Sequence, residues 1–550
     1  MNKVRKVLLI ALVSLSIGNY INAQIFPVYF ADVIKEGNKE ILHFEWRPDY
    51  LTYDRAVITD HKGEMVAVLS YPLHTLDITQ IQGHSTLFIT AEDINEEKSE
   101  PVKVDLHIDY SSLYADGPAE RIMIKKQRGE NARFVGTQSG MEFIAKGVNF
   151  CGIRLADHDS FEPDIIATQA HVDRVGRVNS NPATSLVHPV KEGDRIQFYD
   201  SHRSETLMRI LKSNGYNLVR VFVKPGERGS EITHIRGMSG PTNTQGLSDA
   251  YMDNFVDFLT RAQTYGIYVM PCFTENEMLD NDYFKALSKG ASKQGILFSE
   301  DGIRAKQHYM ELFLQYIKKQ NPELINSLFA LSMQNEFAFH SDEAPFNQQS
   351  GSYTFIDGSS YDMADDEQRR DLANAAIQNY YAKMKEAVAA NAPGLLLGEG
   401  TFSMGAVGKT YENSKGIRAI EGNKDLRFPM TAVELLKTDI DFLDFHVYRW
   451  GCPGTGAEVF KYFAENMKLF TPEAKELMKN KPIIMGEFGS FNFDETTLDE
   501  AIDFVKELNK AALDFGFKGS AYWTLDTFVQ TNLWNLMWEN GKMLKALSNK

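Results

Sequence analysis

From residue 25 to about residue 116, short apolar runs alternate with turn-forming residues. The runs are ILHFEW (41–46), RAVIT (55–59), MVAVLSY (65–71), STLFITA (85–91) and VKVDLHI (102–108). Each has the length of a strand, and no segment of helical length and periodicity separates them. The pattern predicts a small all-β sandwich over residues 24–118, with Trp46 in its core.

From residue 119 onwards the periodicity changes, and strands alternate with amphipathic helices. The expected strands are 145–150, 217–223, 267–273, 328–334, 395–400, 441–448, 482–488 and 519–525. The expected helices are 203–214, 249–264, 303–319, 366–390, 456–468 and 496–515. Eight apolar strands with helices between them predict a (β/α)₈ barrel over 119–550. The alternative, a doubly wound open sheet, lacks a glycine-rich phosphate turn after its first strand.

Two connections are long for a compact domain: 151–202 after the first barrel strand and 337–365 after the fourth. Such loops at the carboxyl ends of barrel strands often build binding sites. The first loop carries several possible metal ligands. These are Asp157, His158, Asp159, His171, Asp173 and His188. Their irregular spacing favours solvated side chains over a metal site, so we expect no metal and no cofactor.

The first residues, 1–23, have the pattern of a signal peptide. Lys3, Arg5 and Lys6 precede an apolar run from Val7 to Ile17, which is too short to span a bilayer. With small Ala23 as the cleavage point, we expect export to the periplasm or the extracellular space. The rest of the chain has no second long apolar segment, so no membrane insertion is expected.

Charge and cysteine content narrow the classes of partner. The formal net charge is −16, and it becomes −19 when the three basic residues of the leader are removed. Such an acidic chain argues against nucleic acid and anionic lipid, whereas a neutral polymer meets no electrostatic penalty. The three cysteines, Cys151, Cys272 and Cys452, are far apart and lack metal-type spacing, so we expect buried thiols, although one pair could form a disulfide. We expect a monomer.

Polar residues gather at the ends of the predicted barrel strands, which converge on one mouth. They are Arg220, Asn335, Glu336, His446, Tyr448, Glu487 and Trp523. Glu336 and Glu487 follow the fourth and seventh strands, roughly across that mouth. Two facing carboxylates are what cleavage of a glycosidic bond requires. Either acid alone would more simply be a salt bridge at the rim; together they predict a catalytic pair.

Six short motifs occur in one order on these strands: KGVNF, NLVRV, MQNE, FHVY, IIMGEFG and AYW. In this set and order, residues 130–550 resemble clan A of the glycoside hydrolases, and within it family 5, the cellulase and mannanase family. The resemblance implies that Glu336 is the acid/base and Glu487 the nucleophile. The sandwich is similar to immunoglobulin or fibronectin-III domains, through the hairpin-like stretch ITAEDINEEKSEPVKV, and an accessory role is expected for it.

The same resemblance implies roles for the other strand-end residues. Asn335 would bind the sugar 2-hydroxyl, Arg220 and Tyr448 would contact Glu487 and favour its ionised form, and Trp523 would form a stacking platform. His446 would lie near the sugar or the acid/base. Trp523 could instead be a core residue. Trp450, Trp534 and Trp538 could stack on sugars or pack the rim, and Glu399, in GEGTF, is a possible substrate contact.

Two departures leave the substrate open. The third strand reads VMPCFTEN where many family members carry a His, and Phe337 stands where a Pro often follows the Asn–Glu pair. GEGTF and FHVYRW favour a secreted retaining hydrolase of β-1,4-mannan. The alternatives are an exo-acting β-mannosidase or β-glucosidase, an endo-β-1,4-glucanase, a transglycosylase using the same residues, and a carbohydrate-binding protein without activity.

Overall fold

The structure is a computed structural model. It describes residues 25–150, except 26, 37, 47–51, 72, 82, 107–109 and 118, then 165–166, 195–196, 201–223, 246–247, 249–273, 276–525 and 533–548. The expected signal peptide (1–23), Cys151 and the candidate ligands of the first long loop lie outside these residues. Contacts divide the chain into two compact units, Met1–Ile108 and Asp109–Lys550. Each unit is described by itself.

The first unit is the expected sandwich of two antiparallel sheets. One sheet has the order β1-β2-β5, formed by β1 (Tyr29–Glu36), β2 (Lys39–Glu45) and β5 (Thr75–Asp77). The other has the order β4-β3-β6-β7, formed by β4 (Met65–Ser70), β3 (Tyr53–Asp60), β6 (Thr86–Asp93) and β7 (Val102–Asp105). The sequence pattern located five of these strands and missed β1 and the short β5.

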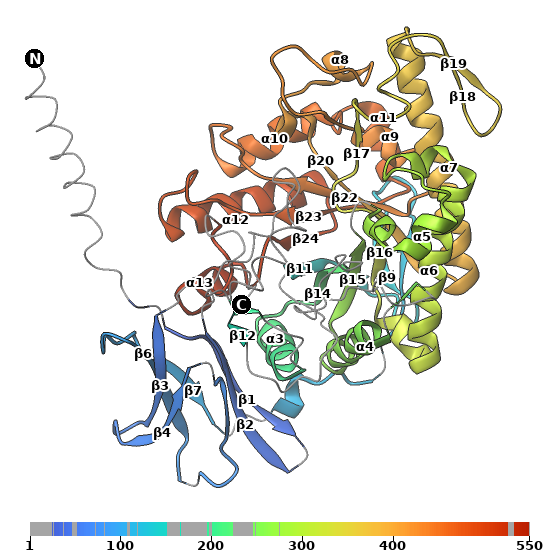
Figure 1. The fold of residues 1–550 in the computed structure, drawn as a ribbon. Coiled ribbons are helices and arrows are strands. Elements are labelled where there is room, and N and C mark those ends of the chain that lie inside the picture. Colours follow the sequence, from blue (N-terminus) through green and yellow to red (C-terminus); the bar gives the residue numbers. More distant parts are fainter. Residues whose placement is uncertain are drawn as a thin grey trace, which may run out of the picture. The chain divides into compact units, whose positions relative to one another are not determined.

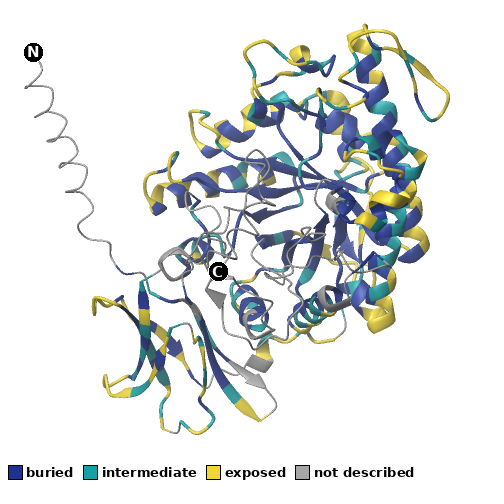
Figure 2. Ribbon diagram, in the orientation of Figure 1, coloured by how far each residue is buried: buried dark blue, intermediate teal, exposed yellow. Residues whose placement is uncertain are grey.

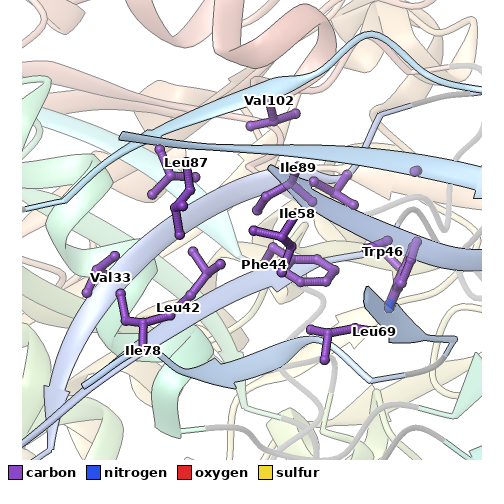
Figure 3. Packing of buried hydrophobic residues seen from close by; sticks show 14 of the residues in the cluster. Val33, Leu42, Phe44, Trp46, Ile58, Leu69, Ile78, Leu87, Ile89 and Val102 are labelled. Atoms are coloured by element: carbon purple, nitrogen blue, oxygen red, sulfur yellow. The ribbon is translucent and has the colours of Figure 1, made fainter. Parts of the chain in front are cut away.

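Alternate side chains from both sheets form one apolar core, drawn in Figure 3. Trp46 follows β2 and is 1% exposed, as expected for a core residue. Its indole Nε1 donates a hydrogen bond to the backbone oxygen of Leu73 at 3.0 Å, and its ring lies 4.9 Å from that of Tyr53. The polar end of the indole is therefore satisfied inside the core, as burial requires.

The boundary between the units differs from the expected one. The sequence placed it after residue 118, whereas the contacts place it after Ile108. The reason is the segment that follows η1 (Tyr110–Leu113): the Tyr114 ring lies 5.5 Å from that of Tyr265, and the Ala115 N–H donates to the Thr264 oxygen at 2.9 Å. Turn-rich residues without periodicity carry no signal of which neighbour they pack on.

The second unit is a closed barrel of eight parallel strands, which confirms the predicted fold (Figure 1). In order around the barrel these are β11 (Ala145–Phe150), β14 (Leu218–Val223), β15 (Tyr268–Phe273), β16 (Ala330–Ser332), β20 (Leu396–Phe402), β22 (Phe442–Val447), β23 (Ile483–Phe488) and β24 (Gly519–Tyr522). All their described residues are buried except Lys146 and Tyr268, which explains why the strands read as continuous apolar runs (Figure 2).

Helices follow the strands and cover the barrel, with buried inner and exposed outer faces in Figure 2. The long ones are α3 (Ser201–Ser213), α4 (Asp249–Thr264), α6 (Glu300–Gln320), α7 (Asp366–Asn391), α10 (Gly456–Asn466) and α12 (Leu498–Phe515). Their ends follow capping chemistry. Ser299 caps α6 by accepting from the Gly302 N–H, so this helix begins three residues before the apolar periodicity indicated. Thr455 and Thr497 form capping boxes at α10 and α12.

A small sheet closes the amino-terminal end of the barrel. It consists of β8 (Ile122–Lys125), β9 (Arg133–Gly136) and β10 (Glu142–Phe143). Phe134 is fully buried and its ring lies 5.0 Å from that of Phe329 and 5.6 Å from that of Phe442. This plug leaves the carboxyl ends of the strands as the open mouth of the barrel.

Shorter strands and helices lie in the connections between the barrel strands and the long helices, or after the last barrel strand. The strands are β12 (Ile165–Ile166), β13 (Arg195–Ile196), β17 (Ala338–His340), β18 (Ser352–Thr354), β19 (Ser360–Asp362) and β21 (Arg427–Pro429). The helices are η2 (Glu277–Asp280), α5 (Asp282–Leu287), η3 (Gly295–Phe298), η4 (Pro322–Ser327), η5 (Met404–Val407), α8 (Tyr411–Ser414), α9 (Ala432–Leu436), α11 (Pro472–Met478) and α13 (Trp538–Ala546).

The loop after the fourth barrel strand is ordered by one buried cation. Arg369 of α7 is 0% exposed and donates to the backbone oxygens of Phe346, Gln348, Met363, Gly416 and Ile417. A guanidinium has five N–H donors, and here they tie the loop to a segment 50 or more positions further along the chain. Within the described residues, no helix has the length and apolar character needed to cross a membrane.

Replacing Trp46 by Ala should destabilise the first unit. The change removes a fully buried indole and leaves the Leu73 oxygen without its partner, which costs about 3–5 kcal/mol in comparable cores. Thermal unfolding of the full chain should show an early transition in Trp46→Ala that is absent from the control Met65→Ala, whose side chain is 70% exposed. Equal unfolding curves would contradict the assignment of Trp46 to the core.

Candidate active site

Asn335 and Glu336 lie just beyond β16, held against β20. The Gly400 N–H donates to the Gln334 oxygen at 3.2 Å, and the Phe337 N–H donates to the Gly400 oxygen at 2.9 Å. A Cβ on Gly400 would meet the Asn335 oxygen at 1.9 Å. The glycine is therefore needed for the close backbone approach that brings the amide and the acid to the mouth.

The bond from Phe337 also explains one departure from the family pattern. A proline at this position would have no N–H to donate to Gly400. Phe337 is instead buried, with its ring 5.0 Å from that of Phe339. The strand-like pairing with β20 continues through this residue, and the aromatic ring adds to the core of the loop.

Arg220, on β14, joins the polar residues of the mouth. It is fully buried, and each side of its guanidinium has an acceptor. Nε donates to Asp444 Oδ2 at 2.9 Å, and Nη1 donates to Glu487 Oε1 at 2.7 Å and to Asn149 Oδ1 at 2.9 Å. Nη2 donates to Asn335 Oδ1 at 2.9 Å. One side chain thus orients groups from β11, β22, β23 and the segment after β16.

His446, on β22, lies between the two predicted catalytic acids. Its Nδ1 is 3.1 Å from Glu336 Oε1 and 3.4 Å from Glu487 Oε2, and its Nε2 is 3.4 Å from Asp444 Oδ1. His446 and Glu487 are register partners on adjacent strands. The structure thus brings Glu336, Glu487 and His446 together, as the sequence predicted.

The two acids differ in exposure. The Glu487 side chain is 5% exposed, whereas that of Glu336 is 22% exposed. One oxygen of each lies within 4.8 Å of the other. Glu336 therefore faces the open side of the mouth, and Glu487 lies deeper, between Arg220 and Tyr448, whose hydroxyl donates to Glu487 Oε2 at 2.9 Å.

The pKa of Glu487 departs from the expectation that its donors favour the ionised form. His446 and Arg220 do lower it, but burial acts more strongly, and the charges of Glu336 and Asp444 add to burial. The net effect raises the pKa of Glu487 above its ordinary 4.5. Removal from water, which strand periodicity does not report, acts together with the two nearby anions to outweigh the two cations.

Two further groups have shifted pKa values of clear cause. Burial would lower the pKa of His446, but the charges of Glu487 and Asp444, with hydrogen bonds to Asp444 and Glu336, outweigh it and raise this pKa to about 10. Burial would raise the pKa of Asp444, but Arg220 and His446 outweigh it and lower this pKa. At neutral pH the site therefore holds an imidazolium and a guanidinium against buried carboxylates.

Cys272 and Trp523 pack around this polar centre. Cys272, on β15, is fully buried with Sγ 4.0 Å from Asn335 Oδ1, and burial raises the pKa of its thiol to about 12. Trp523 is 4% exposed, with its ring 5.4 Å from that of Phe222. The described surroundings leave little of the indole open, so its stacking role stays a prediction.

Glu399 is not in the mouth, which corrects its prediction as a substrate contact. It is fully buried and lies beside Tyr381 of α7 and Lys306 of α6. Burial raises its pKa well above the usual range, and Tyr381 and Lys306 are the first groups that oppose the shift. Because side chains alternate along β20, Gly398 and Gly400 face one side and Glu399 faces the other, toward α6 and α7.

The remaining tryptophans differ in position. Trp450, after β22, is 50% exposed and its ring lies 5.6 Å from that of Tyr448, beside the mouth. Trp534 is half-buried and its Nε1 donates to the Glu495 oxygen at 2.8 Å. The side chain of Trp538 lies outside the described residues. Cys452 is a half-buried free thiol.

The sequence reasoning missed two residues of the centre, Asp444 and Asn149. Asp444 is two positions before His446 in DFLDFHVY, and period-two alternation places 444, 446 and 448 on one face of the strand. That signal was available. Asn149, in KGVNF, donates to the Gly486 oxygen at 2.7 Å and accepts from Arg220. No local pattern distinguishes an Asn with this role from one at an ordinary strand end.

Glu336, His446 and Glu487 are also the group within the described residues whose donor atoms converge closely enough for a metal ion. Their partners do not suit one. Arg220 and Tyr448 already donate to Glu487, and a protonated imidazole has no lone pair for a cation. The arrangement suits proton transfer and nucleophilic attack by carboxylates.

Comparison with known proteins finds neighbours among solved structures only. No family model matches the chain, and no curated protein matches it. One neighbour is the endo-1,4-beta-mannanase from Rhizomucor miehei, at 14% identity and a TM-score of 0.46, over 78% of this chain and 98% of that one.

Two other neighbours are an exo-beta-1,4-mannosidase from the Opitutaceae bacterium strain TAV5 and the endo-beta-1,4-mannanase from Thermotoga petrophila. The first is 13% identical over 73% of this chain and 55% of that one, with a TM-score of 0.41. The second is 12% identical over 74% and 77%, with a TM-score of 0.42. At these identities and scores the likeness decides nothing about activity.

Gly400→Ala should destabilise the second unit. The new Cβ would meet the Asn335 oxygen, so the segment carrying Asn335 and Glu336 must move, at a cost of about 1–3 kcal/mol. Denaturant unfolding measures the change. The control is Gly117→Ala, where a Cβ would meet nothing within 4 Å. Unaltered stability in Gly400→Ala would show that the close approach is not needed.

Asp444→Asn should lower the pKa of His446 from about 10, because it removes one of the anions that stabilise the imidazolium. A raised folded-state pKa contributes stability that is complete below the ordinary value of 6.5 and is lost as pH rises through the folded-state value. The variant should lose this contribution at lower pH. Nuclear magnetic resonance titration of His446 measures the pKa; Asp425→Asn, which affects a pair with Arg427, is the control.

Proposed function

We propose that the protein is a retaining β-glycoside hydrolase. The observation that carries this proposal is the pair Glu336 and Glu487, with oxygens within 4.8 Å of each other. Carboxyl groups about 5–5.5 Å apart are typical of retaining enzymes, and about 6.5–9.5 Å is needed to fit a water molecule in inverting ones. The unequal exposure of the two acids supports different roles for them.

In the proposed first step, Glu487 attacks the anomeric carbon while Glu336 gives its proton to the leaving oxygen. The bond from carbon to the leaving oxygen breaks, and a covalent glycosyl ester forms on Glu487. Arg220 at 2.7 Å and the Tyr448 hydroxyl at 2.9 Å hold the attacking carboxylate in place. Arg220 holds the side-chain oxygen of Asn335, and we assign the amide nitrogen of this residue to the sugar 2-hydroxyl.

In the proposed second step, Glu336 takes a proton from water, whose oxygen attacks the same carbon. The bond from this carbon to Glu487 breaks, the sugar is released, and Glu487 returns to its carboxylate form. Esterification removes the charge of Glu487, which is the first of the anions that raise the pKa of His446. The imidazolium then has fewer anions around it, and Glu336 is its nearest carboxylate at 3.1 Å. Because His446 contacts both acids, a change in the charge of Glu487 alters the charged environment of Glu336 through the imidazole.

For the substrate we propose a β-linked polysaccharide or oligosaccharide, with β-1,4-mannan as the first choice and export as the setting. Trp450 beside Tyr448 supports a sugar-binding mouth. The GEGTF motif does not support mannan as the substrate. Gly400 allows the close approach of the Asn335 backbone, and Glu399 is buried. A screen of mannan, glucan, xylan and aryl β-glycosides identifies the sugar, and product lengths separate endo from exo action.

Alanine variants of Glu487 and Glu336 should differ in how their activity depends on the leaving group of the substrate. Glu487→Ala should lose activity on every substrate, because no ester can form. Glu336→Ala should lose about 10²–10⁴-fold on polysaccharide but much less on an aryl glycoside with a good leaving group, which needs little protonation. The matched control is Glu386→Ala, an exposed acid on α7 paired with Lys383.

Product stereochemistry provides the decisive measurement. The first anomer that the wild type releases should keep the β configuration, and an α product would overturn the retaining mechanism. Binding of polysaccharide with no release of reducing sugar would favour a carbohydrate-binding protein. Longer products formed from short substrates would favour transglycosylation.

A further inference from the structure

A cluster of four neighbouring aromatic rings extends from the deeper carboxylate to the surface. We call Tyr448, Trp450, Phe491 and Phe493 the aromatic ledge. Ring centroids are 5.6 Å apart for Tyr448 and Trp450, 5.5 Å for Trp450 and Phe491, and 5.1 Å for Phe491 and Phe493, which stack at 11°. Because the Tyr448 hydroxyl donates to Glu487, the ledge begins at the proposed nucleophile.

The ledge has a buried inner pair and an exposed outer pair. Tyr448 and Phe491 are each 5% exposed and lie 5.6 Å apart, whereas Trp450 is 50% exposed and Phe493 is 57% exposed. Single exposed aromatic residues are ordinary, but these two both contact the buried pair beside the carboxylates. Packing of the barrel rim would explain the inner pair and leaves the outer pair without a reason.

The loop that carries Trp450 is held in a specific conformation. Trp450 has φ = 49° and Gly451 has φ = 71°, in the left-handed region that a bulky residue rarely adopts. The turn is fixed on one side by Arg449, whose Nη2 lies 2.8 Å from Glu495 Oε1 and whose guanidinium lies over the Phe504 ring at 4.4 Å. Strain retained in this way is typical of functional positions.

The loop that carries Phe491 and Phe493 is fixed through the same acid. Ser490 donates to Glu495 Oε2, and the Phe491 oxygen accepts from the N–H groups of Asp494 and Glu495 at 3.0 Å. Phe491 also forms an antiparallel bridge with Leu533. Glu495 therefore ties the two loops together, and the outer rings are positioned before any ligand arrives.

We propose that the aromatic ledge is a subsite for sugar units beyond the one whose bond is cleaved, so that the substrate is an extended β-linked chain. The proposal rests on the proposed function and deepens it. The apolar faces of pyranose rings match aromatic rings, and the ledge continues directly from the carboxylate pair. A protein partner seated there would cover the mouth. Binding energy from such distant units can be used at the reacting bond.

The test follows catalysis as the substrate lengthens. For Trp450→Ala and Phe493→Ala, kcat/KM is measured on an aryl β-glycoside and on oligosaccharides of two to six units of the sugar that the wild type cleaves. The deficit should grow with chain length and reach about tenfold on the longest. Trp450→Phe and Phe493→Tyr should restore most of it, because an aromatic face returns.

A matched control removes an exposed aromatic ring elsewhere. Tyr462 on α10 is 46% exposed, and Tyr462→Ala should match the wild type at every chain length. A deficit of equal size on all substrates would show that the ledge only supports the fold of the mouth, and no deficit would show that it does not contact sugar. Either result overturns the inference.

Binding separates this inference from the proposed function. Calorimetry with β-1,4-linked hexasaccharides of mannose, glucose and xylose is made on the wild type and both alanine variants. If the wild type cleaves nothing but binds one hexasaccharide at least about tenfold more tightly than the variants, the hydrolase proposal fails and the ledge stands. If it cleaves glycosides with no effect of the variants, the ledge fails and the hydrolase stands. If it binds no hexasaccharide, the ledge fails.

Discussion

The buried guanidinium of Arg220 is the interaction on which the site depends. A cation without access to water must be matched by anions and acceptors, and Asp444, Glu487, Asn149 and Asn335 supply them at 2.7–2.9 Å. These partners come from distant parts of the chain. Asn149 is the register partner of Arg220 on the adjacent strand, whereas Asp444, Glu487 and Asn335 are brought to it by the closed barrel. The fork geometry of the guanidinium then sets the orientation of the Glu487 carboxylate and of the Asn335 amide.

The two acids have different surroundings. Glu487 lies with the cations in the buried layer, while Glu336 lies on the open side of the mouth. His446 contacts both acids through Nδ1, and Asp444 stabilises its imidazolium at Nε2. The resulting balance of buried charge is a property of the whole cluster, so no single pair accounts for the pKa of any member.

Two glycines make this packing possible. A Cβ at Gly486 would meet Asp444 Oδ1 at 1.5 Å, and one at Gly400 would meet the Asn335 oxygen at 1.9 Å. Both lie on barrel strands where a side chain would otherwise face the centre. Their absence of a side chain lets the polar layer sit close to the strands, while the aromatic rings of Tyr448 and Phe491 enclose it from the outer side.

Periodicity along the sequence determined the architecture and the identity of the acid pair. Strand and helix repeats reflect burial on one face or two, which is a local property, so the eight barrel strands and most sandwich strands could be located from apolar runs alone. Strand order then brought Glu336 and Glu487 to the same mouth. The tertiary structure decided the rest: that Asp444 and Asn149 complete the cluster, that Glu399 is buried on the other face of its strand, and that burial and two nearby anions outweigh two cations in setting the pKa of Glu487. These outcomes depend on which side chains from distant strands share one small volume, and a linear pattern carries no record of that.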